Sequence, residues 1–145
     1  MKNLFGVFVL LIASAANAEI YEDYEPSEQY SQLTVISVQP NYLDDYLVNL
    51  KRTWVRGMEI QKDLGYIVDY GVWTSASANS PNVWLTITYE NMGAMQPSKS
   101  RADAVEAEWE KRYGDDDEVM EKISKSYEKI RTMVDSQIIN KGVFK

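Results

Sequence analysis

Apolar residues switch between strand spacing and helix spacing along this chain, and the order of these switches constrains its fold most. Residues 33–39, LTVISVQ, are β-branched and apolar on both faces, which suits a strand that is covered on both sides. A helical stripe follows, with apolar residues three or four positions apart: Leu43, Leu47, Leu50, Trp54 and Met58. Gly65 comes soon after the stripe and predicts the end of this long helix.

Two short strands and a helical region come next. Residues 67–74 and 82–90 have strand patterns, and the polar, turn-rich link between them predicts a hairpin. Residues 100–113 and 115–134 have helical patterns, and residues 138–144, IINKGVF, suit a last short strand. This order predicts an α+β chain, a ferredoxin-like βαββαβ sandwich whose antiparallel sheet carries its helices on one face.

The predicted strand over residues 82–90 has two unlike faces. One face is apolar and should meet the helices: Val83, Leu85, Ile87 and Tyr89. The other face carries Trp84 and Thr86, and the preceding strand adds Trp73 to it. Because helices on one side leave this face uncovered, we expect Trp73, Trp84 and Thr86 to form the interface of a homodimer with two-fold symmetry. The alternative is that Trp84 is an isolated surface residue.

The first eighteen residues have the pattern of a secretory signal peptide. Lys2 is followed by an apolar run over residues 4–12 and by the cleavage pattern Ala16-Asn17-Ala18. Because this run is too short to span a bilayer, we expect no stable membrane anchor and a periplasmic or secreted protein. A retained membrane anchor is the alternative.

The chain after residue 18 divides into an arm and one domain. Residues 19–32 are acidic, contain three tyrosines and show no period, which predicts a flexible arm. An arm whose tyrosines contact a partner subunit is the alternative. Residues 33–145 are then a single ferredoxin-like α/β-barrel domain.

The composition excludes several kinds of chemistry. The chain has no histidine and no cysteine, so Ser-His-Asp and Cys-His catalysis, the usual zinc sites and histidine-ligated haem cannot be built. The acidic run over residues 115–118 lacks the alternating oxygens and glycine of a calcium loop and suits the start of a helix. We therefore expect no metal and no cofactor.

The net charge argues against nucleic acid as a partner. Removing residues 1–18 takes away one cation, Lys2, and no acid, so the net charge of −7 becomes −7 − 1 = −8. Such an acidic protein is repelled by phosphate backbones and by anionic lipid surfaces. We expect neither nucleic acid nor a membrane surface to be the partner.

Several long segments resemble the dimeric α/β-barrel superfamily. They are LTVISVQPNYLDDYLVNLKRTW, QKDLGYIVDYGVW and NVWLTITYENM, followed by the helical C-terminal part and IINKGVF. Members of this superfamily are ferredoxin-like subunits that pair their sheets into a barrel, and the chain is most similar to small exported members of unassigned activity. The superfamily includes cofactor-free monooxygenases, small-lactone isomerases, polyketide cyclases and haem enzymes. The resemblance implies a homodimer and, as in many members, a ligand pocket between the helices and the sheet.

The residues that would line such a pocket are mostly aromatic. They are Tyr46, Trp54 and Met58 on the long helix, Tyr70 and Tyr89 on the strands, and Arg131 as a partner for a ligand carboxylate. Aromatic walls with a few hydroxyl groups suit a flat or hydrophobic small molecule. The alternative is that these residues fill the core and that Arg131 forms a buried ion pair.

No residue matches a catalytic motif of the superfamily, so we assign no catalytic residue, and three functions stay open. The first is an exported homodimer that binds a small hydrophobic or aromatic molecule. The second is a cofactor-independent monooxygenase or isomerase acting on an aromatic substrate. The third is a structural or interaction protein without a ligand.

Overall fold

The computed structural model describes residues 19–75 and 81–145, so the expected signal peptide over residues 1–18 lies outside the described residues. Four strands form one open, antiparallel sheet in the order β2-β3-β1-β4. They are β1 (Tyr24–Val38), β2 (Asp69–Thr74), β3 (Val83–Tyr89) and β4 (Arg131–Phe144). The predicted α+β class, the antiparallel sheet and the pairing of the second and third strands are confirmed, and the arrangement is compatible with a ferredoxin-like fold.

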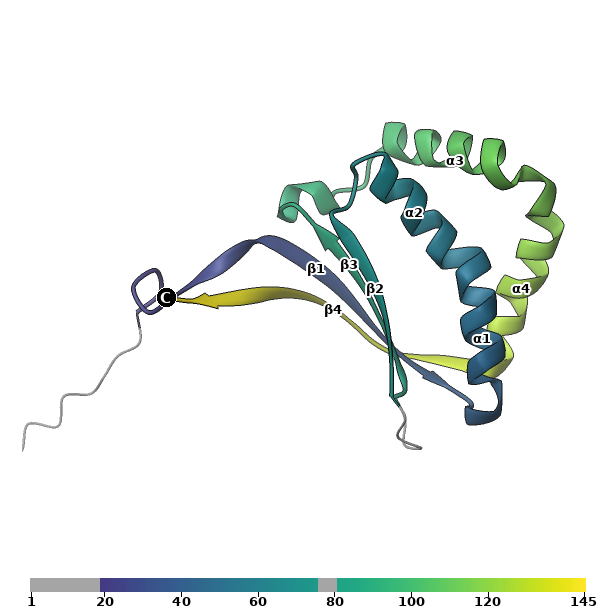
Figure 1. Ribbon diagram of the computed structural model, residues 1–145, viewed down its shortest axis with the longest axis horizontal. Coiled ribbons are helices and arrows are strands. Elements are labelled where there is room, and N and C mark those ends of the chain that lie inside the picture. Colours follow the sequence, from purple (N-terminus) through teal and green to yellow (C-terminus); the bar gives the residue numbers. More distant parts are fainter. Residues whose placement is uncertain (1–18, 76–80) are drawn as a thin grey trace, which may run out of the picture.

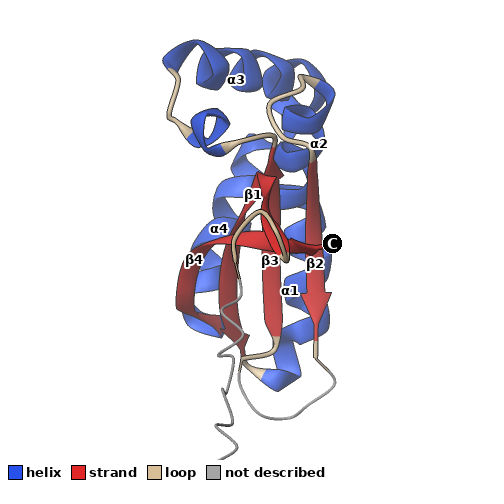
Figure 2. Ribbon diagram, turned by 90° about the vertical axis from the view of Figure 1, so that its left-hand side faces the viewer, coloured by secondary structure: helices blue, strands red, loops and turns tan. Residues whose placement is uncertain are grey.

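The helices lie on one side of this sheet (Figures 1 and 2). Helix α1 (Leu43–Leu50), a π-helical turn (Lys51–Val55) and helix α2 (Arg56–Asp63) follow one another without a break and form the predicted long helix. Helix α3 (Lys99–Tyr113) contacts α2, and helix α4 (Asp117–Ile130) contacts α1. Within the described parts of the chain, no helix has both the length and the apolar character needed to cross a membrane.

The main core forms between the sheet, α1 and α4. Its buried residues are Ile36, Val38, Val83 and Leu85 from the sheet, Tyr46 and Leu50 from α1, and Met120, Ile123 and Tyr127 from α4. Asn82, which is 6% exposed, accepts a hydrogen bond from the backbone N–H of Val38 and donates one to its carbonyl. These paired bonds fix the start of β3 against the end of β1, so the buried amide costs little free energy.

Strands β1 and β4 extend beyond the four-stranded part of the sheet as a two-stranded ribbon (Figure 1). Strand β3 pairs with β1 over residues 30–36, whereas Tyr24 still pairs with Phe144 of β4. Residues 24–32, which the sequence placed in a flexible arm, therefore belong to β1. The physical reason is that β4 is twice as long as the predicted strand over residues 138–144 and provides backbone partners for this segment.

Helix α4 ends earlier than the apolar pattern predicted. Val134, expected on the stripe of a helix over residues 115–134, lies in β4 because α4 ends at Ile130. The backbone N–H of Gln39 donates to the carbonyl of Ile130 at 2.9 Å, and its side chain donates to the carbonyl of Lys129 at 2.9 Å. These bonds satisfy carbonyl groups that have no partner within the helix and allow it to stop there.

The two faces of the sheet differ in the way that the alternation of β3 predicted. Val83 and Leu85 are 0% and 6% exposed and pack in the core on the helix side. Trp73 and Trp84 are direct partners in the register of β2 and β3, and they lie on the opposite face. No helix among the described residues covers that face (Figure 1).

Candidate ligand-binding cavity alongside helix α3

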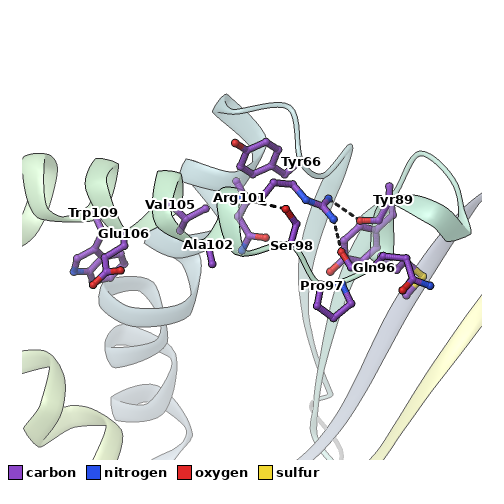
Figure 3. Close-up of a pocket in the computed structure, with 13 residues that line it drawn as sticks. Tyr66, Tyr89, Gln96, Pro97, Ser98, Arg101, Ala102, Val105, Glu106 and Trp109 are labelled. Carbon is purple, nitrogen blue, oxygen red and sulfur yellow. Dashed lines mark hydrogen bonds between the residues drawn. The ribbon is translucent and has the colours of Figure 1, made fainter.

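A cavity of about 460 Å³ lies alongside α3, where this helix meets the end of α2 and the loop after β3 (Figure 3). Its lining residues are Gln61, Tyr66, Tyr89, Ala94, Met95, Gln96, Pro97, Ser98, Arg101, Ala102, Val105, Glu106 and Trp109. Most of these side chains are aromatic or aliphatic. Both the volume and this lining are typical of sites that hold a small molecule.

Helix α3 forms one wall because residues four positions apart share a helical face. Arg101, Val105 and Trp109 have this spacing, and all three line the cavity. Ser98 caps the helix, and its hydroxyl accepts a hydrogen bond from the backbone N–H of Arg101 at 3.4 Å. The cap fixes where the helix starts and therefore which residues face the cavity.

A short 3₁₀ turn, η3 (Met92–Met95), and the residues after it form the opposite wall. Asn91 begins the turn, since its side-chain oxygen accepts a hydrogen bond from the backbone N–H of Ala94 at 2.9 Å. The Arg101 guanidinium donates to the carbonyl of Ala94 at 2.8 Å and also to the carbonyl of Gln96 (Figure 3). Arg101 thus connects the first turn of α3 to η3 and holds the two walls together.

The cavity presents aromatic faces and few polar groups. Arg101 lies 5.7 Å from the centre of the Tyr66 ring, a cation–π contact that fixes one edge of the cavity. Burial raises the pKa of Tyr89, although the positive charge of Arg101 opposes this. The Tyr89 phenol is therefore un-ionised at neutral pH and can donate a hydrogen bond. Glu106 lines the other end as an exposed carboxylate.

In the part of the chain that the structure describes, no three metal-ligating side chains are grouped so that they could hold a metal ion. The cavity is lined by one carboxylate, that of Glu106, by the Arg101 guanidinium, which already donates to two backbone carbonyls, and by neutral oxygen and nitrogen groups. Its donor set therefore suits the hydrogen-bonding atoms of an organic molecule.

Among the described residues that the sequence proposed for a pocket, Tyr89 alone lines this cavity. Tyr46 and Met58 are 0% and 7% exposed and are buried in the interior. Trp54 packs edge-on against Tyr70, with 5.7 Å between the ring centres. The resemblance placed the ligand between the long helix and the sheet, whereas this cavity lies beside α3.

Arg131 lies where α4 passes into β4, among aromatic rings. Its guanidinium donates to the Tyr46 hydroxyl at 3.0 Å and lies 4.5 Å from the centre of the Tyr127 ring. It also lines a smaller cavity of about 270 Å³ together with Gln39 and Lys129. The cation sits at the C-terminal end of a helix, where the helix dipole favours positive charge. Its position is accounted for without a ligand.

The sequence patterns did not point to Tyr66, Arg101 or Trp109. The available signal was the four-residue spacing of Arg101, Val105 and Trp109 within the predicted helix over residues 100–113. No residue of α3 is buried, and the helix has no strong apolar stripe. Its sequence therefore does not mark one face as functional.

The predicted interface residues lie together on the uncovered face of the sheet. Trp73, which is 62% exposed, donates through its indole Nε1 to the Thr86 hydroxyl at 3.4 Å. A Cβ added at Gly71 would lie 2.8 Å from that same Nε1. Gly71 therefore leaves the space in which the indole lies along the sheet beside Trp84. Exposed aromatic surface of this kind is typical of contact sites.

Comparison with known proteins gives no match to this chain among family models, curated proteins or solved structures. The cavity and the uncovered sheet face are the two features of the described residues that indicate a function.

Proposed function

We propose that the chain forms an exported, ferredoxin-like homodimer that binds a small apolar or aromatic molecule in the cavity alongside α3. The cavity itself is the observation that carries the proposal. It is an open groove of about 460 Å³ between α3, the end of α2 and the loop after β3, and most of its lining side chains are aromatic or aliphatic. It falls within the range of volumes that hold small ligands.

The lining residues indicate the chemistry of the ligand. Tyr66, Tyr89 and Trp109 offer aromatic surfaces, which favour a flat apolar molecule. Met95 adds a flexible and polarisable side chain that can adapt to an irregular shape. The un-ionised Tyr89 hydroxyl and the Gln61 amide can each form a hydrogen bond. A molecule with one or two polar atoms therefore fits this site better than an ion.

The uncovered sheet face supports the homodimer. Two copies that pack these faces together would bury the indoles of Trp73 and Trp84, which the isolated chain leaves on the surface. The cavity stays accessible in such a dimer, because it lies on the helix side of the sheet (Figure 3).

We expect Trp84→Asp to halve the mass measured by light scattering. Val48→Asp, on the exposed surface of α1, should leave the mass unchanged, and an unchanged mass for both variants contradicts the dimer.

A matched pair of substitutions on α3 tests binding. Ala102 lines the cavity, whereas Ala107 is also exposed on the same helix but is not a lining residue. The apolar dye N-phenyl-1-naphthylamine, whose fluorescence rises in apolar surroundings, serves as the probe. We expect saturable binding to the wild type and to Ala107→Phe, and binding at least roughly tenfold weaker to Ala102→Phe, a loss of about 1.4 kcal/mol. Equal affinity for all three proteins, or no saturable binding, would rule out this site.

Glu106 favours a second candidate function, that of a cofactor-independent monooxygenase or isomerase. Its carboxylate lines the cavity beside Trp109 and could accept a proton from an aromatic substrate that binds at that end (Figure 3). Oxygen uptake and product analysis with a panel of phenols tests this function. The enzyme function is supported if the wild type turns over a phenol and Glu106→Gln abolishes this turnover but still binds the phenol. Binding without turnover supports the binding function, and the absence of both supports the structural role.

A further inference from the structure

A second cavity adjoins the first on the other side of η3. Its volume is also about 460 Å³, and its lining includes Gln32, Met92, Ser136 and Ile138. Met95, Gln96 and Pro97 line both cavities. This short segment is therefore a wall that the two cavities share.

The second cavity opens over the helix side of the sheet, at a place that the helices leave bare. Gln32 is the direct partner of Ile138 in β4 and of Ile87 in β3, so all three lie on the face that carries the core. Ile138 is nevertheless 57% exposed, and Met92 is 45% exposed. The proposed dimer contact through Trp84 lies on the opposite face and would leave this cavity open.

The shared wall is a surface segment, so a ligand can pass along it without displacing the core. Gln96 and Pro97 are both exposed. The wall is held from the α3 side by the two hydrogen bonds that Arg101 donates to the carbonyls of Ala94 and Gln96. A molecule lying across it would contact side chains that are already at the surface.

The first cavity is elongated in the direction of this wall. From Arg101 to Trp109 the axis of α3 rises by about 12 Å. Figure 3 shows Trp109 and Glu106 at one end of the cavity and Gln96 and Pro97 at the other end. The long axis of the first cavity therefore runs toward the residues that it shares with the second.

We infer that the two cavities are subsites of one site for an elongated, uncharged molecule, with a ring beside α3 and a chain that crosses Met95–Pro97. This inference rests on the proposed binding function. None of the residues that line the second cavity is charged, which disfavours an ionised chain because no counter-charge is present. Ile138 and Met92 supply apolar contact, and the side chains of Gln32 and Ser136 can bond a hydroxyl or carbonyl group.

Two phenols that differ in chain length test the inference. 4-Ethylphenol fits within the first cavity, whereas the chain of 4-octylphenol reaches the second. Each methylene group removed from water should raise affinity up to about fourfold, which corresponds to about 0.8 kcal/mol. Because longer chains favour any apolar site, the decisive measurement is how a substitution in the second cavity changes the difference between the two ligands.

We expect Ile138→Asp to weaken 4-octylphenol binding at least roughly tenfold (about 1.4 kcal/mol) and to leave 4-ethylphenol binding unchanged. Ser136→Asp, at another exposed position of the same cavity, should act in the same way if Ile138→Asp folds poorly. Val48→Asp is the control, since Val48 is 64% exposed on α1 and outside both cavities.

The outcomes separate the inference from the function on which it rests. If both phenols bind and neither acidic variant changes their ratio of affinities, the second subsite is refuted and the binding function stands. Equal weakening of both phenols would also refute it. If the wild type binds neither phenol nor the naphthylamine dye, the proposed function itself fails.

Discussion

Replacing Arg101 tests how the wall between the two cavities is held. Its guanidinium donates to the carbonyls of Ala94 and Gln96 and lies over the Tyr66 ring. Arg101→Met keeps an unbranched apolar stem of similar reach and removes every donor and the charge. We expect η3 to unfold locally more often, while the sheet and the other helices stay folded.

The size of the effect follows from the contacts that are lost. A hydrogen bond from a charged donor contributes about 1.5–3 kcal/mol, and we take about 1 kcal/mol for each of these because one is part-buried and the other exposed. A cation–π contact at a solvated site adds about 0.5 kcal/mol. The sum of about 2–3 kcal/mol corresponds to roughly a 30- to 150-fold increase in the equilibrium constant for local unfolding of the turn.

Amide hydrogen exchange measures this equilibrium directly. The N–H groups of Ala94 and Gln96 are both hydrogen-bonded within the turn, so their exchange reports its opening. Arg112→Met is the matched control, because Arg112 lies at the far end of α3 and pairs with Asp63 and Glu108. A change in protection of less than about threefold, well under 1 kcal/mol, or an equal change in the control, would refute the role of Arg101.

Two further predictions concern the sheet face and the core. Gly71→Ala places a methyl group 2.8 Å from the Trp73 Nε1, so we expect the indole to move. Sedimentation should then show a dimer dissociation constant about tenfold higher, and an unchanged constant would remove Trp73 from the contact. Burial raises the pKa of Tyr127 above its usual 10.0, a shift that a hydrogen bond and the charge of Arg131 partly oppose. As the pH rises above 10, the unfolded chain releases this proton before the folded protein does. The contribution of Tyr127 to stability is therefore present below pH 10 and lost above it. Urea titrations of Tyr127→Phe should show a shallower alkaline loss of stability than the wild type, and identical slopes would argue against this cause.

Local patterns were sufficient for β3 and for the long helix, which have a clear period of their own. The alternation of β3 predicted correctly that Val83 and Leu85 face the helices. The apolar stripe of the long helix was confirmed even though a π-helical turn over Lys51–Val55 interrupts its regular spacing. In both segments the side chains that face the core also determine the local structure, so the sequence alone is enough to predict the element and its buried face.

The strand structure of residues 24–32 and the early start of β4 could not be predicted in this way, because they depend on pairing between distant residues. Tyr24 and Phe144 are direct partners although they lie at opposite ends of the described chain. Residues 138–144 were correctly predicted as a strand, whereas residues 24–32 show no alternation that favours a strand over a loop. Strand β4 supplies the backbone hydrogen bonds that make residues 24–32 a strand.

The cavity could not be predicted either, because a cavity depends on how neighbouring volumes fit together. Tyr46 and Tyr89 are both tyrosines within apolar patterns of the sequence. Tyr46 is fully buried in the core, whereas Tyr89 lines the cavity. The environments of the two tyrosines differ because α3 passes beside Tyr89, and the contacts at the two ends of α3 set its path.

Those contacts explain why a space remains beside the middle of α3. The first turn is tied to η3 through Arg101, and the last turn is tied to α2 by the ion pair of Arg112 with Asp63, at 2.7 Å. Between them Trp109 packs against the core, but Val105 and Trp109 are both only partly buried, so apolar surface remains on the cavity side of the helix.

A ligand in the cavity would cover this apolar surface of α3. At a free concentration one hundred times its dissociation constant it should stabilise the fold by about 2.7 kcal/mol. Because α3 gains the new contacts, its amides should become more protected than those of β1. Protection that rises equally in both elements would show that the ligand binds elsewhere.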